Sequence, residues 1–495
     1  MAVSGIPGNG MYESTTAASS GSLIYAVPDD LIQTVLQHLS ATDLCHVASC
    51  CRWLRDATNQ DSLWLPLCQS KGWKHYGTTT DLAKIPSYGP SEQAGDDSAT
   101  FQNDRIVTDD NTAGLTSTCR WKGVYMRAHH LDRNWATNCS HFKECHFDLQ
   151  DKPRTDLRTH SVDGDLLAMY NFNQTIHVYD IRNQTLQCVI NSACNLYAIK
   201  FTDGVIVVPC DNGRVDAFDA RTGQTLQTIE GNWGHNTVSL FFDGELVLTC
   251  VHTSDTERTM STDICVWCVE DGLLQRIITV DHTDDVCVYY TGKLDYRDKM
   301  LAAVCNDDHI HVWDARSGEC LHQLECPRKQ TKVQLGDNVI FGFSTKGDVC
   351  VTSIWSQETG DCQKVIDLHV GLPTPYIGEY YTEIINNLIL LEIKINVLDV
   401  RSSVKTYNLL GEFVNDAQLE YNDGDVKGNG SKGLFNLFVE TRMGREDWKG
   451  VVFNATPTGL VRLFDAGPFE IIWLDEIRMI LFDHKENKLS IHHYW

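Results

Sequence analysis

The chain has 495 residues, of which 42% are apolar and 22% are charged, and its formal net charge is −25 at pH 7. This composition is typical of a soluble globular protein of two or three domains. The first residues have neither a basic start nor an apolar run, and no segment approaches the roughly 18 consecutive apolar residues of a membrane span. We therefore expect a cytoplasmic or nuclear protein.

The negative charge is concentrated beyond residue 150, where 30 basic and 50 acidic residues give a net charge of −20. A surface of this kind repels nucleic-acid phosphates and anionic lipid, which argues against nucleic acid or a membrane as the main partner. A need for solubility explains this negative charge at least as well as a basic partner would.

Two segments are expected to lack a packed core. Residues 1–23 are rich in Gly, Ser, Thr and Ala, and we interpret them as a disordered N-terminus. Residues 77–118 have a similar composition and are interpreted as a polar linker or a long surface loop.

Residues 24–76, between these segments, are expected to form a small helical module. In VPDDLIQTVLQHL, apolar residues recur at helical spacing, while Pro28, Asp29 and Asp30 suit a first turn. A second helix is expected to begin near Thr42 or Asp43 and a third to be capped by Asp61. Their apolar residues are Leu31, Ile32, Val35, Leu36 and Leu39; Leu44, Val47, Ala48 and Cys51; and Leu63, Trp64 and Leu67. The apolar stripes are wide for helices this short, and they leave apolar surface that something else must cover.

The same residues carry a family resemblance. The order Val-Pro, spaced Leu and Ile, Asp-Leu, Cys-Arg and Leu-Trp resembles an F-box, with Val27 in place of the usual Leu and Leu54 in place of the middle Trp. In that family the exposed apolar helices bind the small adaptor subunit of a cullin-based SCF ubiquitin ligase. The resemblance implies adaptor-binding residues at Pro28, Leu31, Val35, Leu36, Leu39, Leu44, Val47, Leu63 and Trp64.

Residues 119–138 are expected to form a linker helix. Trp121, Val124, Tyr125, Ala128 and Leu131 lie on one helical stripe. A Trp-Lys-x-x-Tyr run ending in Asn-Trp is similar to the linker of F-box proteins with WD repeats. The resemblance implies packing by Trp121, Tyr125 and Trp135, and a helix that holds the following domain at a fixed distance from the adaptor.

From residue 139 to residue 495 the apolar residues alternate, as in short strands that end at Asp or an equivalent residue and a turn. These endings are Asp180, Asp219, Cys268, Asp314, Ser356, Asp399, Asp465 and Tyr494, at steps of 39, 49, 46, 42, 43, 66 and 29 residues. The steps scatter around the roughly 40 to 45 residues of a four-stranded propeller blade. The long step contains the Gly-rich insert YNDGDVKGNGSKG.

The series resembles a WD-repeat β-propeller, and Trp313-Asp314 carries the Trp-Asp dipeptide itself. Eight strand endings favour eight blades, with the segment HFKECHFDLQ as the outer strand that closes the ring. Seven blades would follow if the last 29-residue step were not a full unit. The expected fold is thus a small all-α F-box module followed by an all-β propeller.

The sequence has no recognisable nucleophile–base setting, phosphate loop or zinc framework, so we expect no catalysis, no cofactor and no metal. Cys265 and Cys268 have zinc-like spacing, but they point to opposite faces of a strand and no second pair follows. The other cysteines lie singly in apolar runs and are interpreted as reduced thiols. His129 and His130 are interpreted as exposed residues of the linker helix.

The sequence leaves three hypotheses for the function. The first is a non-catalytic substrate receptor of an SCF-type ubiquitin ligase, with adaptor, cullin and a protein substrate as partners. The second is a WD-repeat scaffold without a role in degradation. The third, a propeller hydrolase, has no supporting residue.

Phosphate recognition among related receptors uses arginines early in the first strand of a blade, where this chain has Ser239 and Cys287. We therefore expect a basic or unphosphorylated substrate segment, unless Arg214, Lys332 and Lys346 cluster in the folded chain. The residues that bind the substrate and the oligomeric state are not predicted.

Overall fold

The computed structural model describes residues 28–78, 117–138, 141–145, 160–171, 174–192, 198–210, 214–230, 237–254, 260–282, 293–305, 309–326, 330–346, 349–369, 379–385, 388–394, 403–418, 426–428, 436–439, 450–456, 459–467, 469–475, 477–483 and 486–494. These residues divide into two compact units, with the boundary between Ala128 and His129. The predicted disordered N-terminus and nearly all of the predicted polar linker lie outside the described residues.

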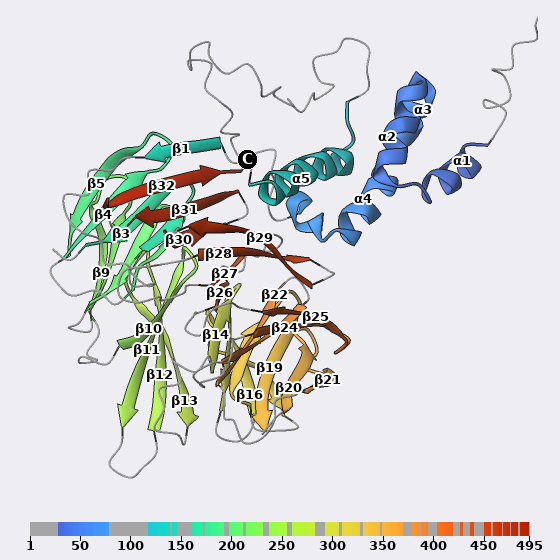
Figure 1. Ribbon diagram of the computed structural model, residues 1–495. Helices are drawn as coiled ribbons and strands as arrows, with labels where there is room; N and C mark the ends of the chain where they lie inside the picture. The colour runs from blue at the N-terminus through green and yellow to red at the C-terminus, as the bar shows by residue number, and fades with distance from the viewer. Residues whose placement is uncertain are drawn as a thin grey trace, which may run out of the picture. The chain divides into compact units, whose positions relative to one another are not determined.

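The first unit is helical (Figure 1). Its elements are α1 (Asp29–Leu36), α2 (Ala41–Cys50), α3 (Arg52–Thr58), α4 (Asp61–Ser70), the 3-10 helix η2 (Trp73–Gly77) and the first part of α5 (Arg120–Ala136). The short helices and the linker helix were predicted, whereas α3 was not. Among the described helices, none combines the length and the apolar character that crossing a bilayer requires.

The caps explain where these helices begin and where the predicted starts were wrong. Helix α2 begins at Ala41 because the Ser40 side chain accepts the N–H of Asp43 at 3.2 Å. Cys51 does not continue α2: it has an extended backbone, and its sulfur accepts the N–H of Leu54 at the start of α3. Asp61 is the first residue of α4 rather than its cap.

The second unit consists mainly of four-stranded antiparallel sheets, of which the described residues form eight. The first sheet contains β2 (His160–Asp163), β3 (Leu166–Tyr170), β4 (Thr175–Asp180) and β5 (Thr185–Asn191). The second contains β6 (Lys200–Thr202), β7 (Val205–Pro209), β8 (Arg214–Asp219) and β9 (Thr225–Glu230). The third contains β10 (Thr237–Phe242), β11 (Leu246–Ser254), β12 (Met260–Cys268) and β13 (Leu274–His282). The fourth contains β14 (Leu294–Arg297), β15 (Met300–Val304), β16 (His309–Asp314) and β17 (Cys320–Glu325).

The later sheets follow the same order along the chain. The fifth contains β18 (Lys332–Leu335), β19 (Val339–Lys346), β20 (Val349–Ser356) and β21 (Cys362–His369). The sixth contains β22 (Glu379–Ile385), β23 (Leu388–Lys394), β24 (Ser403–Asn408) and β25 (Phe413–Gln418). The seventh contains β26 (Val426–Gly428), β27 (Asn436–Val439), β28 (Gly450–Thr456) and β29 (Gly459–Gly467). The eighth contains β30 (Glu470–Leu474), β31 (Arg478–Asp483), β32 (Lys488–His493) and β1 (His141–Cys145).

The eighth sheet joins the two ends of this unit. Strand β1 pairs antiparallel with β32, from His141 opposite His493 to Cys145 opposite Leu489 (Figure 1). The N-terminal segment therefore supplies the outer strand of the last sheet, as predicted. This pairing and the repeated four-stranded sheets confirm the predicted all-β propeller.

Two of the eight predicted strand endings were wrong. The third strand of the sixth sheet ends at Asn408, whereas Asp399 lies outside the described residues. The third strand of the seventh sheet ends at Thr456, and Asp465 lies on the fourth strand, β29. Both predictions relied on a motif of apolar residues followed by Asp. In these two sheets, the strand pairing shows that the third strand is a different segment from the one that carries the motif.

Neighbouring sheets share apolar cores. One core joins the first and second sheets through residues such as Ala168, Ile176, Phe201 and Phe218. Another joins the first and eighth sheets. Its members include Leu167, Tyr179, Ile480 and Ile491. In these three sheets, apolar side chains of neighbouring sheets are therefore buried against one another.

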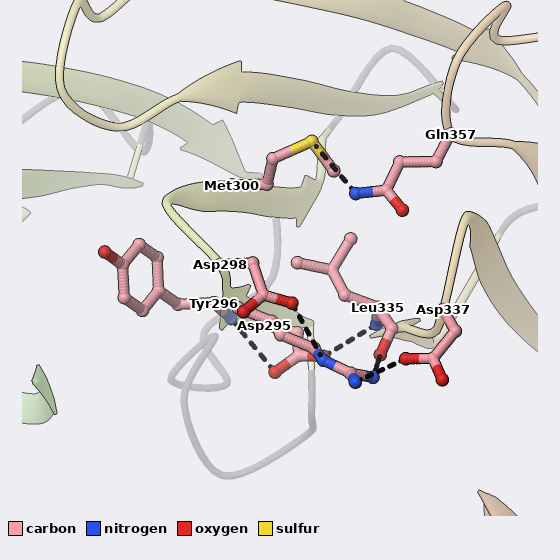
Figure 2. Close-up of polar contacts among 8 residues, drawn as sticks. Asp295, Tyr296, Asp298, Met300, Leu335, Asp337 and Gln357 are labelled. Carbon is pink, nitrogen blue, oxygen red and sulfur yellow. Dashed lines mark hydrogen bonds and ion pairs between the residues drawn. The ribbon is translucent and has the colours of Figure 1, made fainter. Parts of the chain in front are cut away.

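Side chains also hydrogen-bond across the junctions, as Figure 2 shows between the fourth and fifth sheets. The half-buried Asp295 carboxylate accepts the N–H of Leu335 at 2.7 Å, and Arg297 bonds to Asp337 at 2.5 Å. Burial raises the pKa of Asp295, although the backbone N–H groups of Leu335 and Tyr296 oppose that rise by stabilising the carboxylate. The junction therefore depends on directional bonds as well as on apolar contact.

A second set of bonds links five of the outer strands to the next sheet. In each case a polar side chain of one outer strand donates a hydrogen bond to a backbone carbonyl of the next sheet. That carbonyl lies in the turn before the next sheet's outer strand, or at the start of that strand. The pairs are Gln187 with Arg221, Arg276 with Ser317, His322 with Gln357, Lys364 with Leu409, and Asn415 with Leu460, at 2.9 to 3.1 Å. These bonds satisfy carbonyls that the antiparallel ladders leave unpaired.

The prediction of reduced thiols was wrong at one position, because Cys210 is disulfide-bonded. The described cysteines that are free include the exposed Cys45, Cys50 and Cys51 and the buried Cys68, Cys250 and Cys350. Burial raises the pKa of Cys68, Cys250 and Cys350 to about 12, so these thiols stay protonated at neutral pH.

Candidate functional site: an apolar stripe on the helical unit

Helix α1 presents an apolar stripe to solvent. Leu31 is 57% exposed and Val35 is 62% exposed, and both lie on the face that also carries the exposed Pro28. Spacings of three and four residues place these side chains above one another along the helix. Large aliphatic side chains with such exposure are uncommon in a small module unless a partner covers them.

The opposite side of α1 packs into the module. Leu36 is buried, and the Gln33 side chain donates a hydrogen bond to the carbonyl of Ala57 at 2.9 Å. These two contacts fix which side of the helix faces outward. The exposed stripe is therefore a consequence of the packing of α1.

Three other residues of the predicted adaptor-binding set form the core of the module. Leu44, Leu63 and Trp64 are at most 3% exposed. The Trp64 indole N–H donates to the carbonyl of Thr58 at 2.8 Å, which satisfies its polar atom within the core. Leu39 and Val47 are half-buried. The structure thus brings the predicted residues together in one module but gives them different exposures.

The N-terminus of α5 is held by side chains that lie far away in sequence. The Asn59 amide accepts the N–H of Cys119 at 2.7 Å and donates to the carbonyl of Ser117 at 2.8 Å. The Asp61 carboxylate accepts the N–H of Trp121 at 2.8 Å. A carboxylate suits this position because the first N–H groups of a helix are unpaired and carry partial positive charge. Sequence analysis missed both roles, since capping by a distant residue leaves no local pattern.

Aromatic contacts complete the packing of the first part of α5. The Tyr125 ring meets Trp64 edge-on with ring centroids 5.3 Å apart, and meets Trp73 in the same way at 5.1 Å. Trp121 is buried beside them, as predicted for the linker stripe. Gly77 must be small here because a Cβ atom would lie 2.7 Å from the Trp121 ring.

The last turn of α5 belongs to the propeller unit. Trp135 is fully buried and stacks on Tyr494, and the Asn134 amide donates to the Tyr494 carbonyl at 2.8 Å. The Tyr494 hydroxyl donates to the Asn138 side chain at 2.9 Å. Each predicted packing residue of this helix therefore has aromatic or buried contacts within its own unit.

The charged residues considered for substrate binding have partners within the chain. Arg214 pairs with Asp216 at 2.7 Å, and the Lys332 ammonium donates to the Thr382 carbonyl. Lys346 and Ser239 lie on β19 and β10, and Cys287 lies outside the described residues. A cation cluster at Arg214, Lys332 and Lys346 is thus not among the described contacts.

Within the described ranges, no three His, Cys, Asp or Glu side chains are arranged to hold a metal ion. Cys265 is buried and Cys268 is half-buried on β12, and within the described ranges neither belongs to a group of three side chains that could hold a metal ion. His130 contacts Asn134 at 3.2 Å on α5. The described site offers apolar surface and no arrangement suited to metal-dependent chemistry.

Comparison with known proteins agrees with this division of the chain. Residues 24–70 match the family model described as F-box-like. The DENN domain and WD repeat-containing protein SCD1 of Arabidopsis thaliana is 27% identical over 155 residues, which cover 31% of this chain and 12% of that protein. The match therefore spans a small fraction of that relative.

Three solved structures resemble the propeller unit, each over 71% of this chain. The computationally designed protein Ika8 has a TM-score of 0.50 at 18% identity over 99% of its own chain, which indicates a shared fold only. BamB from Moraxella catarrhalis and the C-terminal WD40 domain of Sif2 are each 12% identical, over 99% and 98% of their chains, with TM-scores of 0.47 and 0.46.

The chain combines an F-box-like domain at residues 24–70 with a β-propeller built of four-stranded antiparallel sheets.

Proposed function

We propose that this chain is the non-catalytic substrate-recognition subunit of an SCF-type ubiquitin ligase. The helical unit would bind the small adaptor subunit and, through it, cullin, while the propeller would bind the protein substrate. Ubiquitin transfer would then be accelerated by proximity to the conjugating enzyme, without a side chain of this chain in the chemistry. We place this activity in the cytoplasm, the nucleus or both.

The observation that carries the proposal is the exposed stripe of Pro28, Leu31 and Val35 on an F-box-like module. Two aliphatic side chains exposed by more than half are suited to the centre of an interface, where desolvation gives most of the binding energy. Leu36, Leu44, Leu63 and Trp64 are buried in the module and would act on binding through its fold rather than by direct contact. Leu39 and Val47 would lie at its margin.

The first test is binding of the full chain to the purified adaptor. The double substitution Leu31→Ala and Val35→Ala should weaken binding about thirtyfold or more, which corresponds to roughly 2 to 4 kcal/mol. The melting temperature should change little because both side chains are exposed. Leu226→Ala is the matched control, since Leu226 is 50% exposed on the propeller. Undiminished binding by a folded double variant would remove the proposal.

A role as a scaffold without degradation is the alternative. A reconstituted ligase that contains this chain separates the two, because a substrate receptor must raise the rate at which a bound protein is ubiquitinated. Binding of adaptor without any such increase, for a partner known to bind the propeller, would favour the scaffold.

We further propose that the substrate segment is basic or unphosphorylated, given the net charge of −20 beyond residue 150. Matched phosphorylated and unphosphorylated peptides from an identified substrate test this. A strong requirement for phosphate that charge reversal at a basic patch abolishes would contradict it.

A further inference from the structure

Turns at one end of the propeller can be compared position by position because their backbone bonds are equivalent. In each of the first four sheets, the carbonyl of the last turn residue between the first and second strands accepts an N–H from the residue that follows the third strand. These bonds are Ile181 to Asp165, Ala220 to Gly204, Val269 to Glu245 and Ala315 to Lys299. Asp165, Gly204, Glu245 and Lys299 therefore occupy one position in four successive sheets.

The junction between the third and fourth sheets is closed by charge at this position. The Lys299 ammonium lies 2.7 Å from the Glu245 carboxylate. Arg316, which follows Ala315 in the turn, forms a second ion pair with the same carboxylate. One acidic side chain from the third sheet thus receives two cations from the fourth.

The junction between the first and second sheets has a carboxylate and an arginine at the equivalent positions but lacks the lysine. Asp165 stands where the third sheet has Glu245, and Arg221 stands where the fourth has Arg316. Gly204 takes the place of Lys299, and a Cβ atom added to it would meet no atom within 4 Å. An open groove of about 420 Å³ lies here, bounded by Asp163, Asp165, Asp180, Arg182, Gly204 and Arg221.

The carboxylates around the groove are held in place. Asp163 accepts the N–H of Gly204 at 2.8 Å, and Asp180 accepts both the N–H and the side-chain amide of Asn183 at 2.8 Å. Asp165 lies 3.9 Å from Arg478, whose Nε donates to Asp475 at 2.6 Å. Three carboxylates and two guanidiniums line the groove, so a further cation would balance its charge.

We propose that this groove binds a lysine side chain from a partner protein. Its ammonium would take, against Asp165, the place that Lys299 takes against Glu245, and its aliphatic chain would fill the space above Gly204. The ligand chemistry follows from the chain itself, because the equivalent junction is completed by a lysine. The proposal is independent of ubiquitination and of adaptor binding.

A model compound tests the groove on the full chain. Nα-acetyl-lysine methylamide should bind with a millimolar Kd in a saturation-transfer NMR titration, as expected for one partly exposed charged contact. The norleucine analogue, which has the same aliphatic chain without the ammonium, should bind at least about tenfold more weakly. Equal binding of the two compounds, or no saturable binding of the lysine compound, would overturn the proposal.

Substitutions in equivalent turns make the test specific. Gly204→Lys should fill the groove from within and lower the affinity at least about tenfold, and Lys299 shows that a lysine tolerates this position with φ of 65°. Asn338→Lys is the matched control, because Asn338 has φ of 61° at the same turn position of the fifth sheet and does not line the groove. Asn338→Lys should bind the compound as the unchanged chain does.

Two further variants cover the remaining outcomes. Asp165→Asn removes the central carboxylate without adding volume and should also weaken binding about tenfold, which keeps the proposal testable if Gly204→Lys fails to fold. Lys299→Gly should open a second groove and double the number of bound ligands per chain. Unchanged affinity in both folded groove variants would show that the compound binds elsewhere.

Discussion

Trp135 stacks on Tyr494 with ring centroids 3.6 Å apart and planes inclined by 15°, which fixes the last turn of α5 to the end of the propeller chain. Tyr494 also bonds through its carbonyl to Asn134 and through its hydroxyl to Asn138. One residue near the C-terminus thus makes three different contacts with the segment that leads into β1. The segment that precedes β1 and the residue that follows β32 are therefore joined by these contacts as well as by the hydrogen bonds between β1 and β32.

Tyr494→Ala should destabilise the propeller by about 3 to 4 kcal/mol, because it removes a buried ring and its stacking partner's contact. Chemical denaturation of the full chain, followed by Trp fluorescence, measures this loss. Tyr494→Phe keeps the stack and removes only the hydroxyl bond to Asn138, so it should cost about 1 kcal/mol. Equal losses for the two variants would mean that the stack contributes little.

Asp61→Ala should destabilise the helical unit by about 1 kcal/mol, because the N–H of Trp121 loses its acceptor and the helix N-terminus loses a carboxylate. Asp61→Asn should cost less, since the amide oxygen can still accept the bond. The neighbouring Gln60→Ala is a suitable control, as the Gln60 side chain makes no capping bond. A loss as large for Gln60→Ala would point to a general effect on α4.

Two equivalent turn positions with positive φ, Gly318 and Gln184, should respond to substitution with opposite changes in stability. Gly318 has φ of 73°, and an added Cβ would lie 3.2 Å from the Arg276 side chain, so Gly318→Ala should cost about 1 to 2 kcal/mol. Gln184 has φ of 57° in the corresponding turn of the first sheet, so Gln184→Gly should stabilise the chain by a few tenths of a kcal/mol or more. Thermal unfolding of both variants checks the signs, and a destabilising Gln184→Gly would contradict the strain argument.

His492 should make the propeller less stable in mild acid. Burial lowers the pKa of His492 to about 4, whereas a histidine in the unfolded chain titrates near pH 6.5. Between these values the unfolded state binds more protons than the folded state. The free energy of unfolding therefore decreases as the pH falls from about 6.5 toward 4. We expect this residue to account for a loss of roughly 1 to 2 kcal/mol between pH 7 and pH 5.

Urea denaturation at the two pH values measures this contribution. His492→Gln should flatten the dependence on pH even if the variant is less stable at pH 7. His46→Gln, which replaces an exposed histidine of α2, should leave the dependence unchanged. A full acid loss in His492→Gln would assign the effect to other groups.

The sequence determined the kind of each element because periodicity is a local property. Apolar residues at helical spacing indicated α1, α2 and α4, and alternation indicated the strands. It failed at α3, whose seven residues are too few for a periodic pattern. It also failed at Asp399 and Asp465, where the motif of apolar residues and Asp recurs outside the third strands.

Only the tertiary structure decided which residues of the candidate site are exposed. Helical spacing groups Leu31, Val35 and Leu36 on nearby positions of α1, yet two of them are exposed and the third is buried. The difference depends on where α3 and α4 pack, which the spacing within α1 does not contain. The groove at Gly204 has the same origin. Its charge and space come from turns of two sheets, and the physical reason is that contacts between repeats form only when the ring assembles.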